Sequence, residues 1–83
     1  MPKRDEVTKF VLERLHERSR QMRKIQLEDE TNMLEAGVLD SFALLELVSE
    51  VETKFGIQVD VGKYEFETFS TFGGFCDAVV ESE

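Results

Sequence analysis

Residues 37–56, GVLDSFALLELVSEVETKFG, contain the clearest helix signals of the chain. Asp40 or Ser41 suits the N-cap of a helix, because each side-chain oxygen can accept a hydrogen bond from a free backbone amide. Gly56 suits the left-handed conformation that often ends a helix. Between these signals, five apolar residues recur at helical spacing: Leu44, Leu47, Val48, Val51 and Phe55. We therefore predict a helix over residues 42–55 with one buried face.

The chain that follows this helix predicts a connector and a final helix. Residues 57–61 alternate apolar and polar, but no second alternating run exists to pair with them, so we expect an extended connector. Residues 62–68 allow a short helical turn. Thr68, Ser70 or Thr71 could then cap a last helix whose apolar stripe is Phe72, Phe75, Cys76, Val79 and Val80. Gly73-Gly74 in its first turn costs about 2 kcal/mol of helix propensity relative to two alanines.

The chain that precedes residue 37 predicts a first helix and a long loop. Val7, Phe10, Val11 and Leu15 share one helical face, which predicts a helix over residues 4–24. A long loop follows, and Gly37 permits a positive φ near its end. The outline is an all-α single domain over residues 1–83, with three main helices and a short one.

The charge is strongly acidic and unevenly distributed. Eighteen acids against ten bases give a net charge of −8, and residues 1–24 carry +4 while residues 25–83 carry −12. An acidic surface disfavours nucleic-acid binding, because contacts to the phosphates come mainly from Lys and Arg. It favours partners that present basic side chains. We expect the basic first helix to face away from those partners or to contact something else.

Little in the sequence favours enzyme chemistry. His16 is the only histidine and lies among charged residues, so we expect a surface position rather than a partner for Ser41 or Cys76. Cys76 falls on an apolar stripe, so we expect it to pack in the core as a small apolar residue. The single cysteine excludes an internal disulfide, and no run approaches the ~20 apolar residues of a membrane span. We expect a reduced, cytoplasmic protein that is not an enzyme and does not insert into a membrane.

Metal and phosphate sites are also not expected. Glu28, Asp29 and Glu30 form a carboxylate cluster without the alternating pattern and glycine of a calcium loop, which favours a solvated acidic loop. Gly73-Gly74 follows no strand and precedes no Lys-Ser/Thr pair, so it is not a phosphate loop.

One segment does point to a function. Residues 37–42 place a serine in the first turn of the helix that the sequence predicts most clearly. Plain N-capping is one interpretation. A serine that bears a phosphate ester is the other, since free amides and the positive helix end stabilise an anion. Asp40 would then serve in capping or in the metal site of a modifying enzyme, because its charge opposes a neighbouring phosphodiester.

Residues 34–42, LEAGVLDSF, resemble the attachment motif of acyl and peptidyl carrier proteins. Glu46-Leu47-Val48 and the run from Val51 to Ile57 are similar to the continuation of that motif. Thr71 at the start of a helix that contains Phe75 and Val79 also fits. The resemblance covers roughly residues 5–81, and its strength lies in the combination of these motifs.

This resemblance implies a four-helix bundle of acyl-carrier type with a long first loop and a short third helix. It implies that Ser41, supported by Gly37, Asp40 and Phe42, receives 4′-phosphopantetheine from coenzyme A through a phosphopantetheinyl transferase. It implies a thioester-bound cargo, loaded by an adenylating ligase or acyltransferase and consumed by a condensing or transfer enzyme. The following helix becomes the docking surface, for which we expect Phe42, Leu45, Glu46, Ser49 and Glu50 on a monomer. For Phe42, a partly buried core position is an equal alternative.

The region after residue 55 is most similar to stand-alone D-alanyl and aminoacyl carrier proteins. This similarity favours an aminoacyl cargo. A fatty-acid or polyketide acyl carrier is the alternative, and an unmodified acidic helical adaptor is a third. Gly73-Gly74 and the basic first helix depart from the patterns of both carrier subgroups.

Overall fold

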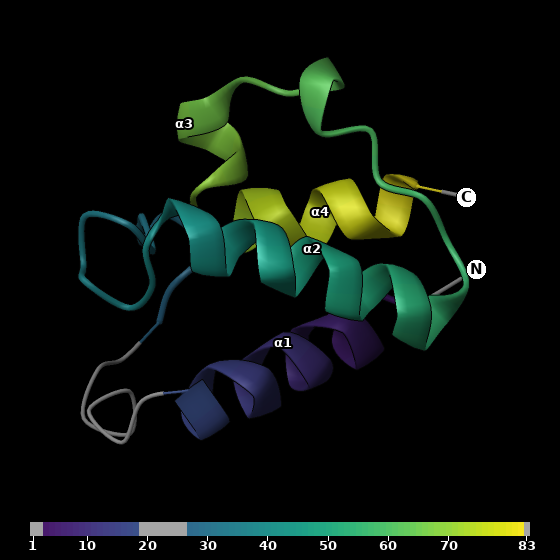
Figure 1. Cartoon of the computed structure of the whole chain (residues 1–83), viewed down its shortest axis with the longest axis horizontal. Helices are drawn as coiled ribbons and strands as arrows, with labels where there is room; N and C mark the ends of the chain where they lie inside the picture. The colour runs from purple at the N-terminus through teal and green to yellow at the C-terminus, as the bar shows by residue number, and fades with distance from the viewer. Residues whose placement is uncertain (1–2, 19–26, 83) are drawn as a thin grey trace.

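The fold is a small bundle of helices, seen in a computed structural model that describes residues 3–18 and 27–82. Its helices are α1 (Arg4–Arg18), α2 (Ser41–Phe55), α3 (Phe66–Phe69) and α4 (Phe72–Glu81), with a 3₁₀ turn, η2, at Val61–Lys63 (Figure 1). Among the described residues, β pairing is limited to one isolated bridge between Asn32 and Thr71. The predicted all-α class with a short third helix is confirmed. The predicted end of the first helix, at residues 19–24, lies outside the described residues.

Helix α2 begins and ends where its capping residues dictate. The Asp40 side chain accepts a hydrogen bond from the Ala43 amide at 2.7 Å, so Asp40 rather than Ser41 is the N-cap, and Ser41 is the first helical residue. Gly56 adopts φ 65° and its amide bonds to the Glu52 carbonyl, as predicted for a C-terminal glycine. The predicted helix is therefore confirmed, one residue longer at its start.

The connector after α2 is extended, as predicted, and a side chain of α2 holds it. The Glu52 carboxylate accepts a hydrogen bond from the Val59 amide at 2.9 Å. Val59 is buried, so this bond satisfies a backbone donor that would otherwise be costly to bury. The turn η2 and helix α3 follow, where the sequence predicted a single short helical turn.

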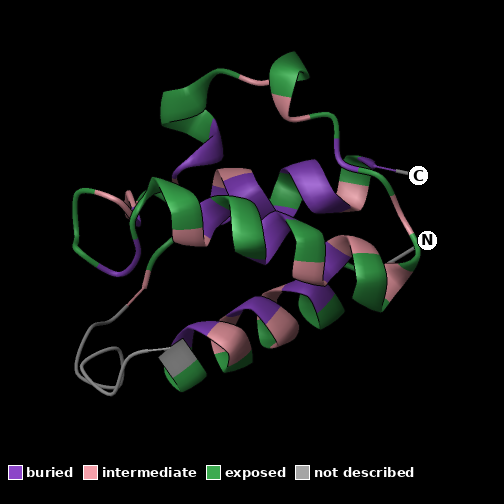
Figure 2. Ribbon diagram, viewed as in Figure 1, coloured by how far each residue is buried: buried purple, intermediate pink, exposed green. Residues whose placement is uncertain are grey.

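The core lies where α1, α2 and α4 meet, and α1 packs against both other helices. Figure 2 shows that the buried faces of these helices point inward. The predicted apolar stripes of all three are buried, apart from the half-buried Phe10, Phe55 and Val80. The ring of Phe69 in α3 packs against that of Phe75 in a tilted arrangement, with 5.1 Å between the ring centroids, and so joins the short helix to the core.

The two glycines at the start of α4 occupy positions where a side chain does not fit. A Cβ on Gly73 would lie 2.6 Å from the Cβ of Asp29, and a Cβ on Gly74 would collide with the Thr68 carbonyl. The close approach lets the Gly73 amide donate to the Asp29 carbonyl at 2.9 Å. Thr71 caps the helix by accepting from the Gly74 amide at 3.0 Å. The glycines that weaken α4 as an isolated helix therefore allow the long loop to pack on it.

The basic first helix does not stand apart from the acidic remainder. Arg4 binds Asp77 of α4 at 2.8 Å and Asp29 of the long loop at 3.2 Å. Arg14 binds Glu50 of α2 at 2.8 Å. The sequence left open whether this helix faces away from partners or contacts something else, and the structure shows that it contacts acids of α2, α4 and the long loop. Arg4 and Arg14 balance these acids, an arrangement that sequence spacing could not show.

Candidate functional site

Ser41 lies at the exposed N-terminal end of α2, beside an open hollow. The hollow has a volume of about 530 Å³ and is lined by Leu34, Gly37, Leu39, Asp40 and Ser41. Ser41 itself is exposed. An exposed hydroxyl at a helix start, with open space beside it, is reachable for chemical modification.

The loop before Ser41 is held on both sides of Gly37. The Asn32 side chain accepts hydrogen bonds from the Leu34 and Glu35 amides at 2.9 and 3.0 Å, which forms a tight turn. Val38 is buried, and its amide donates to the Met33 carbonyl at 3.0 Å. Gly37 makes the reversal between these anchors with a φ of 74°, as the sequence predicted. The core thus fixes the path that leads to Ser41.

The start of α2 favours negative charge next to Ser41. A 15-residue helix leaves free backbone amides in its first turn, and its dipole places partial positive charge there. One carboxylate oxygen of Asp40 accepts a hydrogen bond from the Ala43 amide, which confirms the capping role that the sequence allowed for Asp40. The negative charge of a phosphodiester on Ser41 would lie beside the partial positive charge of this helix end, which would stabilise the phosphodiester.

Apolar side chains stand exposed on the first two turns of α2. Phe42 is 72% exposed and Leu45 is 55% exposed, so the core alternative for Phe42 is wrong. Ser49 is exposed one further turn along, as predicted. Exposed aromatic and aliphatic groups of this size are typical of protein-binding surfaces.

Phe66 is a further exposed residue to which sequence reasoning gave no role. It is 56% exposed in α3, between the exposed acids Glu65 and Glu67. Figure 1 shows α3 at the same end of the molecule as the first turn of α2. The signal in the sequence was an aromatic residue between two acids, outside any apolar stripe.

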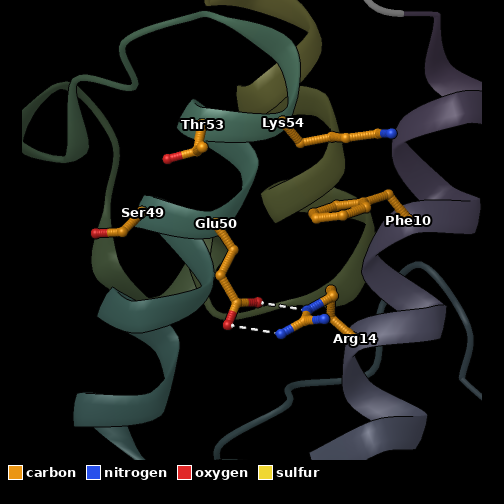
Figure 3. Close-up of a pocket in the computed structure, with 6 residues that line it drawn as sticks. All are labelled: Phe10, Arg14, Ser49, Glu50, Thr53 and Lys54. Atoms are coloured by element: carbon orange, nitrogen blue, oxygen red, sulfur yellow. Dashed lines mark hydrogen bonds and ion pairs between the residues drawn. The ribbon is translucent and has the colours of Figure 1, made fainter.

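The predicted docking acid Glu50 is engaged within the chain. Arg14 of α1 donates to its carboxylate through Nε at 2.8 Å and Nη2 at 3.2 Å (Figure 3). The hydrogen bond to Glu50 and the charge of Glu50 raise the pKa of the Arg14 guanidinium. Glu46 is exposed on the preceding turn.

The residues considered for enzyme chemistry lie apart from Ser41. His16 is exposed on α1, as predicted. Cys76 is fully buried in α4, and burial raises the pKa of its thiol from 9.0 to about 11. Glu28, Asp29 and Glu30 are exposed, as expected for a solvated acidic loop.

Two features are absent from residues 3–18 and 27–82, namely a metal-binding cluster and a membrane-spanning helix. Within these ranges, no group of three or more His, Cys, Asp or Glu side chains is arranged to hold a metal ion. None of the helices there has the length and apolar character that crossing a membrane requires.

Comparison with known proteins identifies the family. The sequence profile of the "Phosphopantetheine attachment site" family matches residues 11–79. Two curated D-alanyl carrier proteins of Streptococcus suis are similar over 50 residues, at 40% identity for strain 98HAH33 and 38% for strain 05ZYH33. Those residues are 60% of this chain and 63% of each relative, so less than two thirds of the relatives' length is matched. No solved structure matches the chain. The profile spans the long loop, α2, α3 and most of α4, and the chain therefore belongs to the phosphopantetheine attachment site family.

Proposed function

We propose that this protein is a carrier that bears 4′-phosphopantetheine on the Ser41 hydroxyl and moves an aminoacyl group between enzymes. In this role the chain performs no catalytic step. The group would supply a terminal thiol that holds the cargo as a thioester. We further propose that the chain forms one carrier domain over residues 1–83 and works as a monomer in the cytoplasm, as the sequence predicts.

The observation that carries this proposal is the placement of Ser41 within a chain of this family. Its hydroxyl is exposed on the first residue of α2, beside the hollow bounded by Leu34, Gly37 and Leu39. The free amides of the first turn would stabilise the attached phosphodiester. The buried Val38 and Leu39 hold the serine at a constant place on the core. A long arm on a fixed anchor raises the effective concentration of its cargo at a docked active site.

The cargo class rests on the relatives. Both are named D-alanyl carrier proteins, which favours an aminoacyl cargo over a fatty-acyl or polyketide one. The proposed partners are a phosphopantetheinyl transferase, an adenylating ligase that loads the amino acid, and an enzyme that receives it.

These partners would dock on the face of α2 that carries Phe42, Leu45 and Ser49. The first two side chains supply exposed apolar area next to the modified serine. Glu46, together with the acidic balance of residues 25–83, supplies steering toward basic partners. Phe66 of α3 adds a third exposed apolar group.

Intact-mass measurement tests the attachment directly. The chain is incubated with coenzyme A, magnesium and a broad-specificity phosphopantetheinyl transferase, and we expect a gain of one phosphopantetheine. Ser41→Ala should gain none. Thr53→Ala is the matched control, since it removes another exposed hydroxyl of α2 outside the proposed docking face and should be modified like the wild type. An unmodified wild type, or a modified Ser41→Ala variant, would contradict the proposal.

The cargo is tested on the modified protein. Holo protein is incubated with ATP, candidate amino acids or fatty acids, and an adenylating enzyme for each class. We expect thioester formation, read as a second mass gain, with an amino acid. Loading with fatty acids alone would show that the cargo assignment is wrong while the attachment site is right.

A further inference from the structure

The loop that leads to Ser41 is anchored at its base to the junction between α3 and α4. The Met33 amide donates a hydrogen bond to the Ser70 carbonyl at 2.8 Å. Asn32, the residue before Met33, forms the isolated bridge with Thr71. Figure 1 shows this loop at the end of the molecule where α2 begins. The backbone at Asn32 is therefore held in place, and its side chain acts on the chain that follows.

The Asn32 side chain organises the turn that comes directly after it. Its Oδ1 accepts hydrogen bonds from the Leu34 amide at 2.9 Å and from the Glu35 amide at 3.0 Å. The Asn32 carbonyl accepts from the Ala36 amide at 2.9 Å, and the Leu34 carbonyl accepts from the Gly37 amide at 3.2 Å. A side-chain oxygen that binds the first amides of a turn has the role of an N-cap. Asn32 thus holds this turn as a cap holds the start of a helix.

This turn forms one wall of the hollow beside Ser41. Leu34 and Gly37 belong to the turn, and both line the hollow together with Ser41. The end of the turn is held by packing, because Val38 is buried. The start of the turn is held by the hydrogen bond from the Leu34 amide to the Asn32 side chain. The shape of the wall therefore depends on Asn32 as well as on the core.

We infer that Asn32 is a positioning residue for the modification of Ser41: its side chain holds the turn against which the transferase and its coenzyme A must fit. The inference rests on the proposed carrier function. The Ser41 hydroxyl is exposed beside the hollow, so a group transferred to it comes to lie next to this wall. A transferase that recognises the ordered turn binds more weakly when the turn is formed only part of the time, because its apparent affinity falls with the competent fraction.

The test uses the full chain as the substrate of the transferase, with KM and kcat for the carrier measured at saturating coenzyme A. Asn32→Ala removes the side-chain acceptor. Asn32→Ser restores an uncharged acceptor, since serine caps about as well as asparagine. Thr71→Ala is the matched control, because it removes another uncharged cap, which accepts from the Gly74 amide on the other side of the same bridge. Circular dichroism and urea denaturation compare the folding and stability of the variants.

We expect Asn32→Ala to raise KM about fivefold and to leave kcat within about twofold of the wild type, because the docked transferase orders the turn again. A fivefold change corresponds to about 1 kcal/mol, which is the usual size of a lost cap. Asn32→Ser should return KM to within about twofold of the wild type. Thr71→Ala should lower the urea midpoint and leave KM within about twofold of the wild type, because its bond stabilises α4 rather than the turn.

Amide hydrogen exchange provides a readout that does not depend on the transferase. In Asn32→Ala we expect faster exchange at the Leu34 amide, which loses its partner, and unchanged exchange at Leu47 in the buried face of α2. In Thr71→Ala the Leu34 amide should exchange as in the wild type. Unchanged exchange at Leu34 in Asn32→Ala would contradict the inference, because the side chain would then not hold the turn.

Three kinetic results would overturn the inference and leave the proposed function intact. An unchanged KM for Asn32→Ala would show that the transferase does not depend on the turn. An equal rise in KM for Thr71→Ala would show that general destabilisation is the cause. A rise that Asn32→Ser does not reverse would show that the asparagine amide itself contacts the partner.

A further variant covers the case in which Asn32→Ala does not fold. Asn32→Gln keeps the amide group but moves its oxygen by one methylene, so a raised KM supports the inference and a wild-type KM contradicts it. A wild type that is never modified would instead contradict the proposed function, and the inference with it.

Discussion

Asp40 and Ser41 are adjacent in the chain, but their side chains serve different ends. Asp40 turns its carboxylate to the Ala43 amide and closes the first turn of α2. Ser41 is left exposed beside the hollow. If the serine capped the helix itself, its hydroxyl oxygen would accept a hydrogen bond from a backbone amide. The aspartate therefore keeps the hydroxyl available.

Removal of the Asp40 cap should weaken the protein measurably. We expect Asp40→Ala to lower the free energy of unfolding by about 1 kcal/mol, because the Ala43 amide loses its partner. Asp40→Asn should retain most of the stability, since an amide oxygen also caps a helix. Urea denaturation followed by circular dichroism measures both. Equal stability of Asp40→Ala and wild type would show that the bond contributes nothing.

At the scale of single residues, the sequence predicted the local conformation around Ser41 but not every contact. Gly37, Asp40 and Ser41 could be placed because their conformational preferences are local. The position of Phe42 could not be decided, because apolar character alone does not separate an exposed docking ring from a core ring. The engagement of Glu50 was missed, because its partner Arg14 lies 36 residues away in the chain.

At the scale of elements, α4 begins in an unusual way. Its first turn contains Gly73 and Gly74, which helix propensity disfavours. The long loop packs against this turn, and the Thr31 and Asp29 carbonyls accept from the Phe72 and Gly73 amides. Orphan amides of the helix start are thus satisfied by the loop that leads to the serine-bearing helix.

Substitution of Gly74 should therefore reverse the usual effect of replacing glycine in a helix. In an open helix, alanine would stabilise by about 1 kcal/mol. Here we expect Gly74→Ala to destabilise by about 2 kcal/mol, because its Cβ would collide with the Thr68 carbonyl. The urea midpoint measures the change.

Gly62→Ala is the matched control for this substitution. A Cβ there would lie 3.6 Å from the nearest atom, an Asp60 carboxylate oxygen, which is an ordinary contact. We expect a change within about 0.5 kcal/mol. If Gly74→Ala were as stable as wild type, the packing at the start of α4 would be looser than described.

The elements themselves were largely predictable, because α2 and α4 combine a cap with a regular apolar stripe. Local sequence also predicted the extended connector. It did not explain Gly73-Gly74, because the reason lies in contact with Asp29 and Thr68 rather than in helix propensity. Propensity describes an isolated helix, whereas this helix forms against a loop.

At the scale of the whole molecule, the basic first helix balances acids on two sides. Arg14 reaches α2, while Arg4 reaches Asp77 of α4 and Asp29 of the long loop. The uneven charge of the sequence is thus partly neutralised inside the fold. Charge counting along the chain predicted an acidic body and a basic helix, but only the tertiary arrangement shows where they meet.

Removal of the Arg4 charge should have a small, salt-dependent effect. The two acidic partners of Arg4 are largely exposed to solvent, although Arg4 itself is partly buried, and this exposure limits the strength of the pairs. We expect Arg4→Gln to lower the free energy of unfolding by about 0.5–1 kcal/mol at low salt. The difference from wild type should shrink near 0.5 M salt. A loss that does not change with salt would point to packing rather than charge. Lys9→Gln is the control, because it removes one positive charge from an exposed position of α1.

The burial of Cys76 has a consequence for sulfur chemistry on this protein. Its thiol is buried in the core, and burial raises its pKa to about 11, so the thiol stays un-ionised near neutral pH. It is the chain's only cysteine. A pantetheine thiol on Ser41 would thus face no competing thiol from its own folded protein. An activated acyl group would find no accessible cysteine to which it could migrate, and maleimide or disulfide reagents would label the arm alone.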